Sequence, residues 1–163
     1  MVLTPDEIGH IAEVATDKDF STPIQDGQRV LFRTTHLGDK YRTFDFLVSI
    51  LGPDHVPQGI FFVQVKGTTR ATAASVRVPI AVGADEFNRL VAAPVPTYLV
   101  GVDVNRRATY IVAAHRRRGS RVSSVTRAFP LGSDAVKVAL HDEVAEYWKA
   151  NGRTLWNTRF RDV

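Results

Sequence analysis

The feature that most constrains the fold is a pair of apolar segments joined by a short, turn-rich stretch. Residues 43–51 and 59–69 are dominated by aromatic and β-branched side chains, which favour extended strands. The connection between them holds Gly52, Pro53 and Gly59, residue types that are common in turns. The pattern predicts an antiparallel hairpin whose second strand is buried.

Three polar residues interrupt this predicted hairpin, and strand geometry brings them together. Gln64 and Lys66 lie two residues apart, so they share one face of their strand. A loop symmetric about residues 54–55 places Asp45 opposite Gln64, and directly opposed residues share a face. A lone aspartate or lysine is costly to bury, which favours their convergence. The pattern fits a functional site, a structural ion pair, or an edge strand whose lysine extends to solvent.

The rest of the chain is predicted to contain further helices and strands. A helix over residues 4–17 begins with a capping box of Thr4 and Glu7, and a helix over 85–93 ends before Pro94. Further strands are expected at residues 29–33, 76–80, 97–104 and 108–114, and a last helix at 141–151. Residues 135–140 fit either a strand or a helix. An antiparallel start followed by a strand–helix–strand crossover predicts an α/β fold, a mixed sheet with helices on both faces, in one domain spanning residues 1–163.

Composition narrows the classes of metal and partner. The 163 residues include no cysteine, so a metal must have oxygen or imidazole ligands, which points to hard ions such as Mg²⁺ or Mn²⁺. No apolar run is long enough for a membrane helix and no signal peptide is visible, so we expect a cytoplasmic protein without membrane contact. The formal charge of +4 includes a basic run at residues 115–121, which fits phosphate contact or a solvated loop.

Around the predicted hairpin the chain resembles a known group of nucleases. Asp45 followed by Gln64-Val65-Lys66 is similar to the motif of the PD-(D/E)xK nuclease superfamily, in the variant where glutamine replaces the second acid. The segment 62–68 more narrowly resembles the VQVKGT strand of the bacterial domain-of-unknown-function 4365 family, and residues 96–103 resemble a later strand of that family. The resemblance covers about residues 4–114 and implies a restriction-endonuclease-like mixed sheet.

The resemblance implies roles for the residues of the motif. Asp45, the side-chain oxygen of Gln64 and the carbonyl of Val65 would bind Mg²⁺ or Mn²⁺. Lys66 would position the attacking water or help to deprotonate it, and it would stabilise the charge that develops on the phosphate. The replacement of an acid by Gln64 removes one negative ligand, although an amide oxygen can still coordinate a metal.

Other residues enter the predicted site less directly. The superfamily places an acid on a helix, and both Glu7 and Glu13 fit that description. The family's glycine before the motif aspartate is replaced here by Thr43. Arginines predicted to hold flanking phosphates are Arg70 and three members of the basic run, Arg116, Arg117 and Arg118.

Three functions remain open from the sequence. The resemblance implies metal-dependent endonuclease-like hydrolysis of DNA or RNA in a bacterial defence or mobile-element setting. The glutamine at position 64 fits instead a degraded nuclease-fold module that binds nucleic acid or a protein partner without cutting. A third reading is an interaction domain in which Asp45 and Lys66 only satisfy each other. Many relatives with this fold are dimers, which favours a homodimer, and the small size of the chain fits a targeting protein partner.

Overall fold

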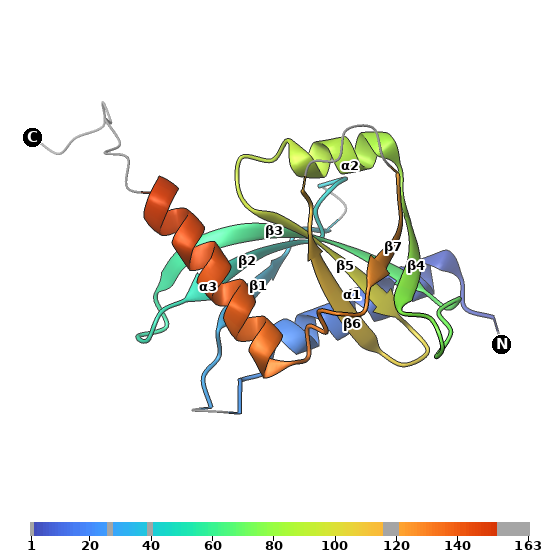
Figure 1. Ribbon diagram of the computed structural model, residues 1–163, viewed down its shortest axis with the longest axis horizontal. Coiled ribbons are helices and arrows are strands. Elements are labelled where there is room, and N and C mark those ends of the chain that lie inside the picture. The colour runs from blue at the N-terminus through green and yellow to red at the C-terminus, as the bar shows by residue number, and fades with distance from the viewer. Residues whose placement is uncertain (1, 26–27, 39–40, 116–120, 153–163) are drawn as a thin grey trace, which may run out of the picture.

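The computed structural model describes residues 2–25, 28–38, 41–115 and 121–152. Within these ranges the chain forms three helices and seven strands (Figure 1). In order they are α1 (Pro5–Ser21), β1 (Phe32–His36), β2 (Phe46–Leu51), β3 (Pro57–Thr68), β4 (Arg77–Val82), α2 (Ala84–Val91), β5 (Thr97–Asp103), β6 (Ala108–Ala113), β7 (Val122–Thr126) and α3 (Asp134–Asn151). Of the helices in the described part of the chain, none combines the length and the apolarity that a membrane crossing requires.

Five strands form a mixed sheet in the order β1-β2-β3-β5-β6. The first three pair antiparallel in chain order, β3 and β5 pair in parallel, and β6 returns antiparallel to β5. A parallel pair requires a crossover connection, and β4 and α2 lie within the one between β3 and β5. The predicted α/β fold with a mixed sheet is therefore confirmed.

Helices α1 and α3 pack on the same face of this sheet. Buried side chains of both helices belong to one core together with Phe61 and Val63 of β3. The close approach of α1 depends on Gly67, because a Cβ at that position would lie 2.9 Å from the carbonyl oxygen of Ile8 and 2.9 Å from the Cβ of Ala12. A side chain at position 67 would thus push α1 off β3.

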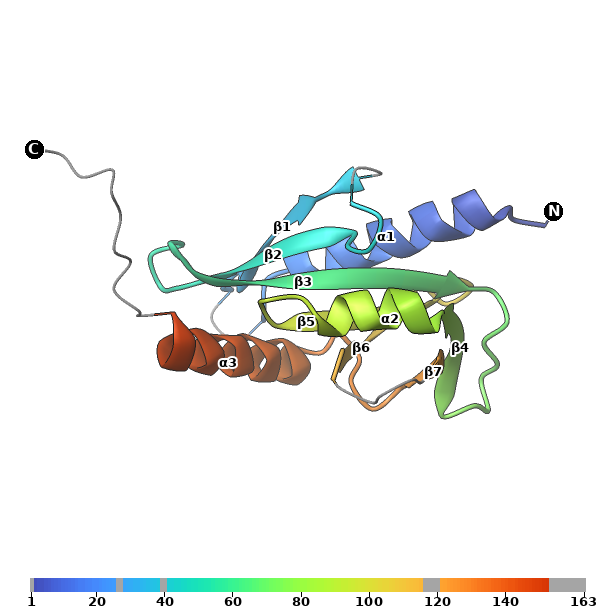
Figure 2. The ribbon, with the colours of Figure 1, turned by 90° about the horizontal axis from the view of Figure 1, so that it is seen from above.

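The opposite face of the sheet carries a second, two-stranded sheet of β4 and β7, with α2 beside it (Figures 1 and 2). Phe87 and Leu90 of α2 share a core with Leu99 of β5 and Val125 of β7. Gly101 makes room for this layer, since a Cβ there would lie 2.2 Å from a methyl group of Val125. The crossover elements therefore cover the face that also carries Gln64 and Lys66.

Several predicted boundaries were wrong, and burial explains the differences. The first helix continues to Ser21 because Phe20 is fully buried, where its ring packs against those of Phe32 and Phe61. The first strand begins at Phe32 rather than at residue 29. The ambiguous segment 135–140 is helical and continuous with the predicted last helix.

One strand, β7, was not predicted at all. Two consecutive serines, Ser123 and Ser124, interrupt the apolar residues of this segment, so its pattern carries no clear strand signal. Ser124 pairs with Pro79 of β4, and Val125 pairs with Val78 in a fully buried position. Pro79 has no backbone N–H to donate, which fits a strand with a neighbour on one side, and among the described residues β4 pairs with β7 alone.

Candidate active site

Asp45 lies where the antiparallel pairing of β2 and β3 ends. The register is as predicted: Phe46 pairs with Val63, so continuing it places Asp45 opposite Gln64. The backbone N–H of Asp45 donates to the carbonyl oxygen of Val63 at 2.9 Å. Its carboxylate oxygen Oδ2 accepts the backbone N–H of Val65 at 2.6 Å. The side chain of Asp45 thus replaces a backbone acceptor and stays fixed beside β3, the motif strand that carries Gln64 and Lys66.

Asp45 lines a hollow of about 460 Å³ together with residues of α1, β1, α2 and the segment between β1 and β2. Other residues that line it include Glu13 of α1, His36 of β1, and Arg42 and Arg89. Glu13 and His36 contact each other, with 2.9 Å between Oε2 and Nε2. A carboxylate, an imidazole and two guanidinium groups therefore line the same hollow as Asp45.

Burial raises the pKa of Asp45 above its ordinary value. The nearby charge of Glu13 raises it further, whereas the hydrogen bond from Val65 and the charges of Lys66 and His36 lower it in part. A bound cation would oppose the net shift, because it favours the charged form of the carboxyl group. The charged form of Asp45, which burial disfavours, would thus be stabilised by a positively charged partner.

Gln64 and Lys66 both contact a residue that the sequence analysis did not single out, Glu86 of α2. The Lys66 ammonium lies 2.8 Å from Oε1 of Glu86, and the Gln64 amide nitrogen donates to the same oxygen. The cost of a lysine in a core strand called for such a partner. Within the β3–β5 crossover only Asp85 and Glu86 are acidic, but no spacing rule chooses between them.

The amide oxygen of Gln64 is a buried polar atom without a hydrogen-bond partner among the described residues. The residue is only 3% exposed. Buried polar atoms are almost always paired, so an exception calls for an explanation such as a missing water or ion. This oxygen is a free acceptor inside the candidate site.

The structure separates the two helix glutamates that the sequence left open. Glu7 closes the predicted capping box: its carboxylate accepts the backbone N–H of Thr4 at 2.7 Å, and this bond lowers the pKa of Glu7. Asp45 responds to the charge of Glu13, and both residues line the same hollow. Glu7 acts as a cap for α1, whereas Glu13 lies at the hollow that Asp45 lines.

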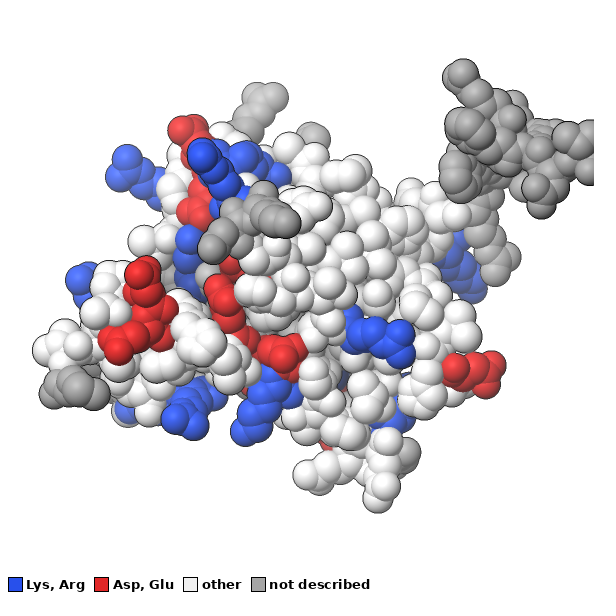
Figure 3. Space-filling view, turned by 180° about the vertical axis from the view of Figure 1, so that it is seen from behind, with Lys and Arg blue, Asp and Glu red and all other residues white. Residues whose placement is uncertain are grey.

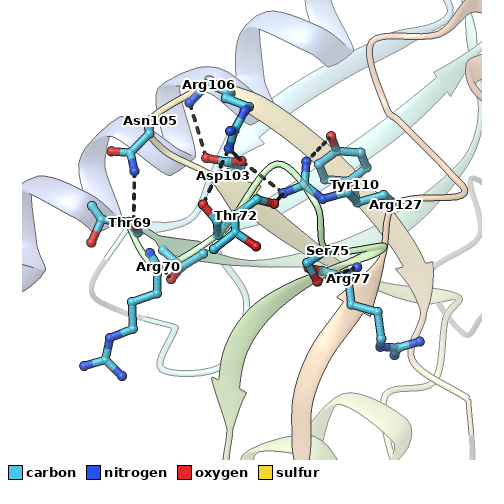
Figure 4. A network of polar contacts seen from close by, with 12 residues as sticks. Thr69, Arg70, Thr72, Ser75, Arg77, Asp103, Asn105, Arg106, Tyr110 and Arg127 are labelled. Carbon is cyan, nitrogen blue, oxygen red and sulfur yellow. Dashed lines mark hydrogen bonds and ion pairs between the residues drawn. The ribbon is translucent and has the colours of Figure 1, made fainter.

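Arg70 follows the motif strand in a loop that a polar network holds in place (Figure 4). The centre of this network is Asp103, which is fully buried and pairs with Arg106 at 2.8 Å and Arg127 at 3.2 Å. Both arginines also donate to carbonyl oxygens of the loop, which belong to residues 71 and 72. In Figure 4 the guanidinium group of Arg70 points away from the network.

The other predicted phosphate contacts, Arg116, Arg117 and Arg118, lie outside the described residues. On the face seen in Figure 3, described lysine and arginine side chains are interspersed with aspartate and glutamate side chains rather than gathered in one patch. On that face, the described residues provide separate cationic groups among acids instead of a continuous basic surface.

The oxygen donors of this site suit a hard divalent cation in chemical type. Asp45 carries a carboxylate, and Gln64 offers an amide oxygen without a partner in the described ranges. Among the described residues no three Asp, Glu or His side chains form one cation-binding group. Mg²⁺ is commonly held by one or two carboxylates together with water and substrate phosphate, which is the arrangement that these donors allow.

Comparisons of the chain with protein-family models, with curated proteins and with solved structures found no match.

Proposed function

We propose that this protein hydrolyses phosphodiester bonds in nucleic acid with Mg²⁺ or Mn²⁺ as cofactor. The observation that carries the proposal is the buried amide oxygen of Gln64, which has no partner among the described residues and lies on β3, opposite Asp45 and two residues from Lys66. A polar atom of this kind is expensive to bury without a ligand. The resemblance of the Gln64-Val65-Lys66 strand to the nuclease motif supports the same chemistry.

Each residue of the site has a defined part in this reaction. Asp45 and the amide oxygen of Gln64 would hold the cation, together with the carbonyl of Val65. A bound Mg²⁺ supplies charge neutralisation at the phosphate and lowers the pKa of the attacking water. Lys66 donates hydrogen bonds to the phosphate oxygens that gain charge in the transition state. The water oxygen gives up a proton and forms a bond to phosphorus, the bond from phosphorus to the leaving sugar oxygen breaks, and that oxygen takes up a proton.

In this proposal Glu13, and not Glu7, is the helix acid. Glu13 and Asp45 line the same hollow, and the hydrogen bond between Glu13 and His36 holds that carboxylate in place. Arg42 and Arg89 line the hollow as well, where their guanidinium groups can contact a phosphate that enters it. The substrate backbone would then approach from this hollow.

A second candidate is a module with the same fold that binds nucleic acid or a protein without cutting. The observation in its favour is that no three acidic or imidazole side chains come together as metal ligands in the described part of the chain. Such a module would bind nucleic acid in a salt-dependent manner, because phosphate contacts release counterions, and it would do so without a metal.

Cleavage of supercoiled plasmid and of single-stranded RNA, each with Mg²⁺, Mn²⁺ or EDTA, separates the two candidates. The test variant is Asp45→Asn, which keeps the shape of the side chain and an acceptor for the N–H of Val65. The control is Asp54→Asn, at an exposed position in the loop between β2 and β3. We expect metal-dependent cleavage that falls by at least about 100-fold in Asp45→Asn only.

Two results would contradict the proposed hydrolysis. Wild-type rates in Asp45→Asn would show that this carboxylate has no part in the reaction. Binding of either nucleic acid by the wild-type protein, without cleavage under any metal condition, would favour the non-cutting module.

A further inference from the structure

Glu86 joins both polar residues of the motif strand through a single carboxylate oxygen. Oε1 accepts from the Lys66 ammonium at 2.8 Å and from the Gln64 amide nitrogen. Among the described residues, no side chain or backbone group donates to the second oxygen, Oε2. The side chain of Glu86 is 21% exposed, so this free oxygen belongs to a largely enclosed carboxylate.

Helix α2 holds Glu86 in this position from two directions. Phe87 and Leu90 bury one side of the helix in the core formed with β4, β5 and β7. Arg89, one turn after Glu86, donates to the hydroxyl of Thr43 at 3.0 Å. Thr43 lies two residues before Asp45, so the helix is tied to the segment just before β2 in which Asp45 lies. Glu86 is therefore fixed relative to both strands of the hairpin.

If Glu86 acted only as a counter-ion for Lys66, that role would explain its contact with Lys66 but not its contact with Gln64. The amide nitrogen of Gln64 donates to Glu86, while its amide oxygen has no partner among the described residues. The contact therefore gathers two oxygens with free acceptor capacity, the amide oxygen of Gln64 and Oε2 of Glu86, at the position of the missing acid. An ion pair alone does not require this arrangement.

We propose that Glu86 supplies the second acidic group of the active site, moved from strand position 64 to helix α2. This inference rests on the proposed hydrolytic function. In the assembled site, Gln64 positions the carboxylate of Glu86 and contributes its own oxygen, and Glu86 contributes the negative charge that a glutamine cannot. The cation that these oxygens take is a hard divalent ion, Mg²⁺ or Mn²⁺.

An exchange of the two side chains tests this assignment. Glu86→Gln removes the charge, and the double variant Gln64→Glu with Glu86→Gln returns it to the strand while keeping one acid and one amide in contact. The control is Asp85→Asn, which removes an equal charge from the same first turn of α2 at an exposed position. The measurements are Mn²⁺ binding by calorimetry without nucleic acid, plasmid cleavage, and thermal unfolding in EDTA to verify that each variant is folded.

We expect Mn²⁺ affinity to fall at least tenfold in Glu86→Gln, to change less than twofold in Asp85→Asn, and to return to within threefold of wild type in the exchanged variant. Cleavage should follow the same order. Wild-type Mn²⁺ affinity and cleavage in Glu86→Gln would overturn the role of Glu86 and leave the proposed hydrolysis intact. If Glu86→Gln does not fold, failure of the folded exchanged variant to bind Mn²⁺ would overturn it. Absence of both Mn²⁺ binding and cleavage in the wild-type protein would overturn both proposals.

Discussion

Replacement of Lys66 by methionine separates a catalytic lysine from a structural one. Methionine keeps most of the aliphatic stem and removes the ammonium group, so the packing of β3 changes little while the ion pair with Glu86 is lost. The two side chains are 31% and 21% exposed and their charged atoms are 2.8 Å apart. The pair is thus intermediate between a surface ion pair and a buried one.

These exposures set the expected effect on stability. Two unit charges about 4 Å apart attract by about 4 kcal/mol at an effective dielectric constant of about 20, before desolvation and side-chain ordering are subtracted. Exposed pairs contribute about 0.2–1 kcal/mol net, and breaking a buried pair costs about 3–5 kcal/mol. For this pair we expect Lys66→Met to lower the free energy of unfolding by about 1–2 kcal/mol. In a domain of this size that corresponds to a Tm lowered by about 2–8 °C.

The expected effect on cleavage is much larger than the effect on stability. Loss of one preorganised group that stabilises transition-state charge lowers the rate by about 100- to 1,000-fold. Plasmid cleavage at 25 °C, where Lys66→Met remains folded, measures this loss, and thermal unfolding measures the stability. Lys66→Arg is the matched control, because it keeps the charge for Glu86 but changes the geometry of the donors. Wild-type cleavage by the methionine variant, from an active parent protein, would refute a catalytic role for Lys66.

Two further predictions concern stability. Because burial raises the pKa of Asp45 above 3.8, the folded protein holds this proton more tightly than the unfolded chain, so the carboxyl group lowers stability increasingly as the pH rises above that value. The Tm of Asp45→Asn in EDTA should therefore rise relative to the Tm of the wild type as the pH increases from 4 to 7. A Tm difference that stays constant over this range would contradict the raised pKa of Asp45. Gly67→Ala should cost about 1–3 kcal/mol by overpacking against α1, whereas Gly9→Ala, where a Cβ meets no atom within 4 Å, should stabilise that helix by up to about 1 kcal/mol. Urea denaturation checks both, and equal effects would show that the close approach at Gly67 is not tight.

The central hairpin could be predicted because its information is local. Turn residues at both ends of residues 52–59 fix the loop, and a period of two fixes which side chains share a face. This sufficed for the register of Phe46 with Val63 and hence for the position of Asp45 relative to Gln64. The capping box of the first helix is local in the same sense, and it was also predicted correctly.

The features that could not be predicted depend on contacts distant in sequence. Residues 135–140 alternate like a strand, and only the burial of Leu140 together with Val144, four residues later, shows why they are helical. Strand β7 forms because Val125 fills the space over Gly101, which no local pattern encodes. The choice between Glu7 and Glu13 likewise depended on where β1 and β2 lie relative to α1.

The position of Glu86 follows from topology once the parallel pairing of β3 with β5 is known. Two adjacent parallel strands need a connection that returns over one face of the sheet. Here one face is occupied by α1 and α3, so the crossover covers the other face, to which Gln64 and Lys66 point. Any acid on the inner side of the crossover helix therefore meets these two residues. In the proposed site, the strand that lacks its own second acid obtains one in this way, from the segment that the parallel pairing of β3 with β5 places above it.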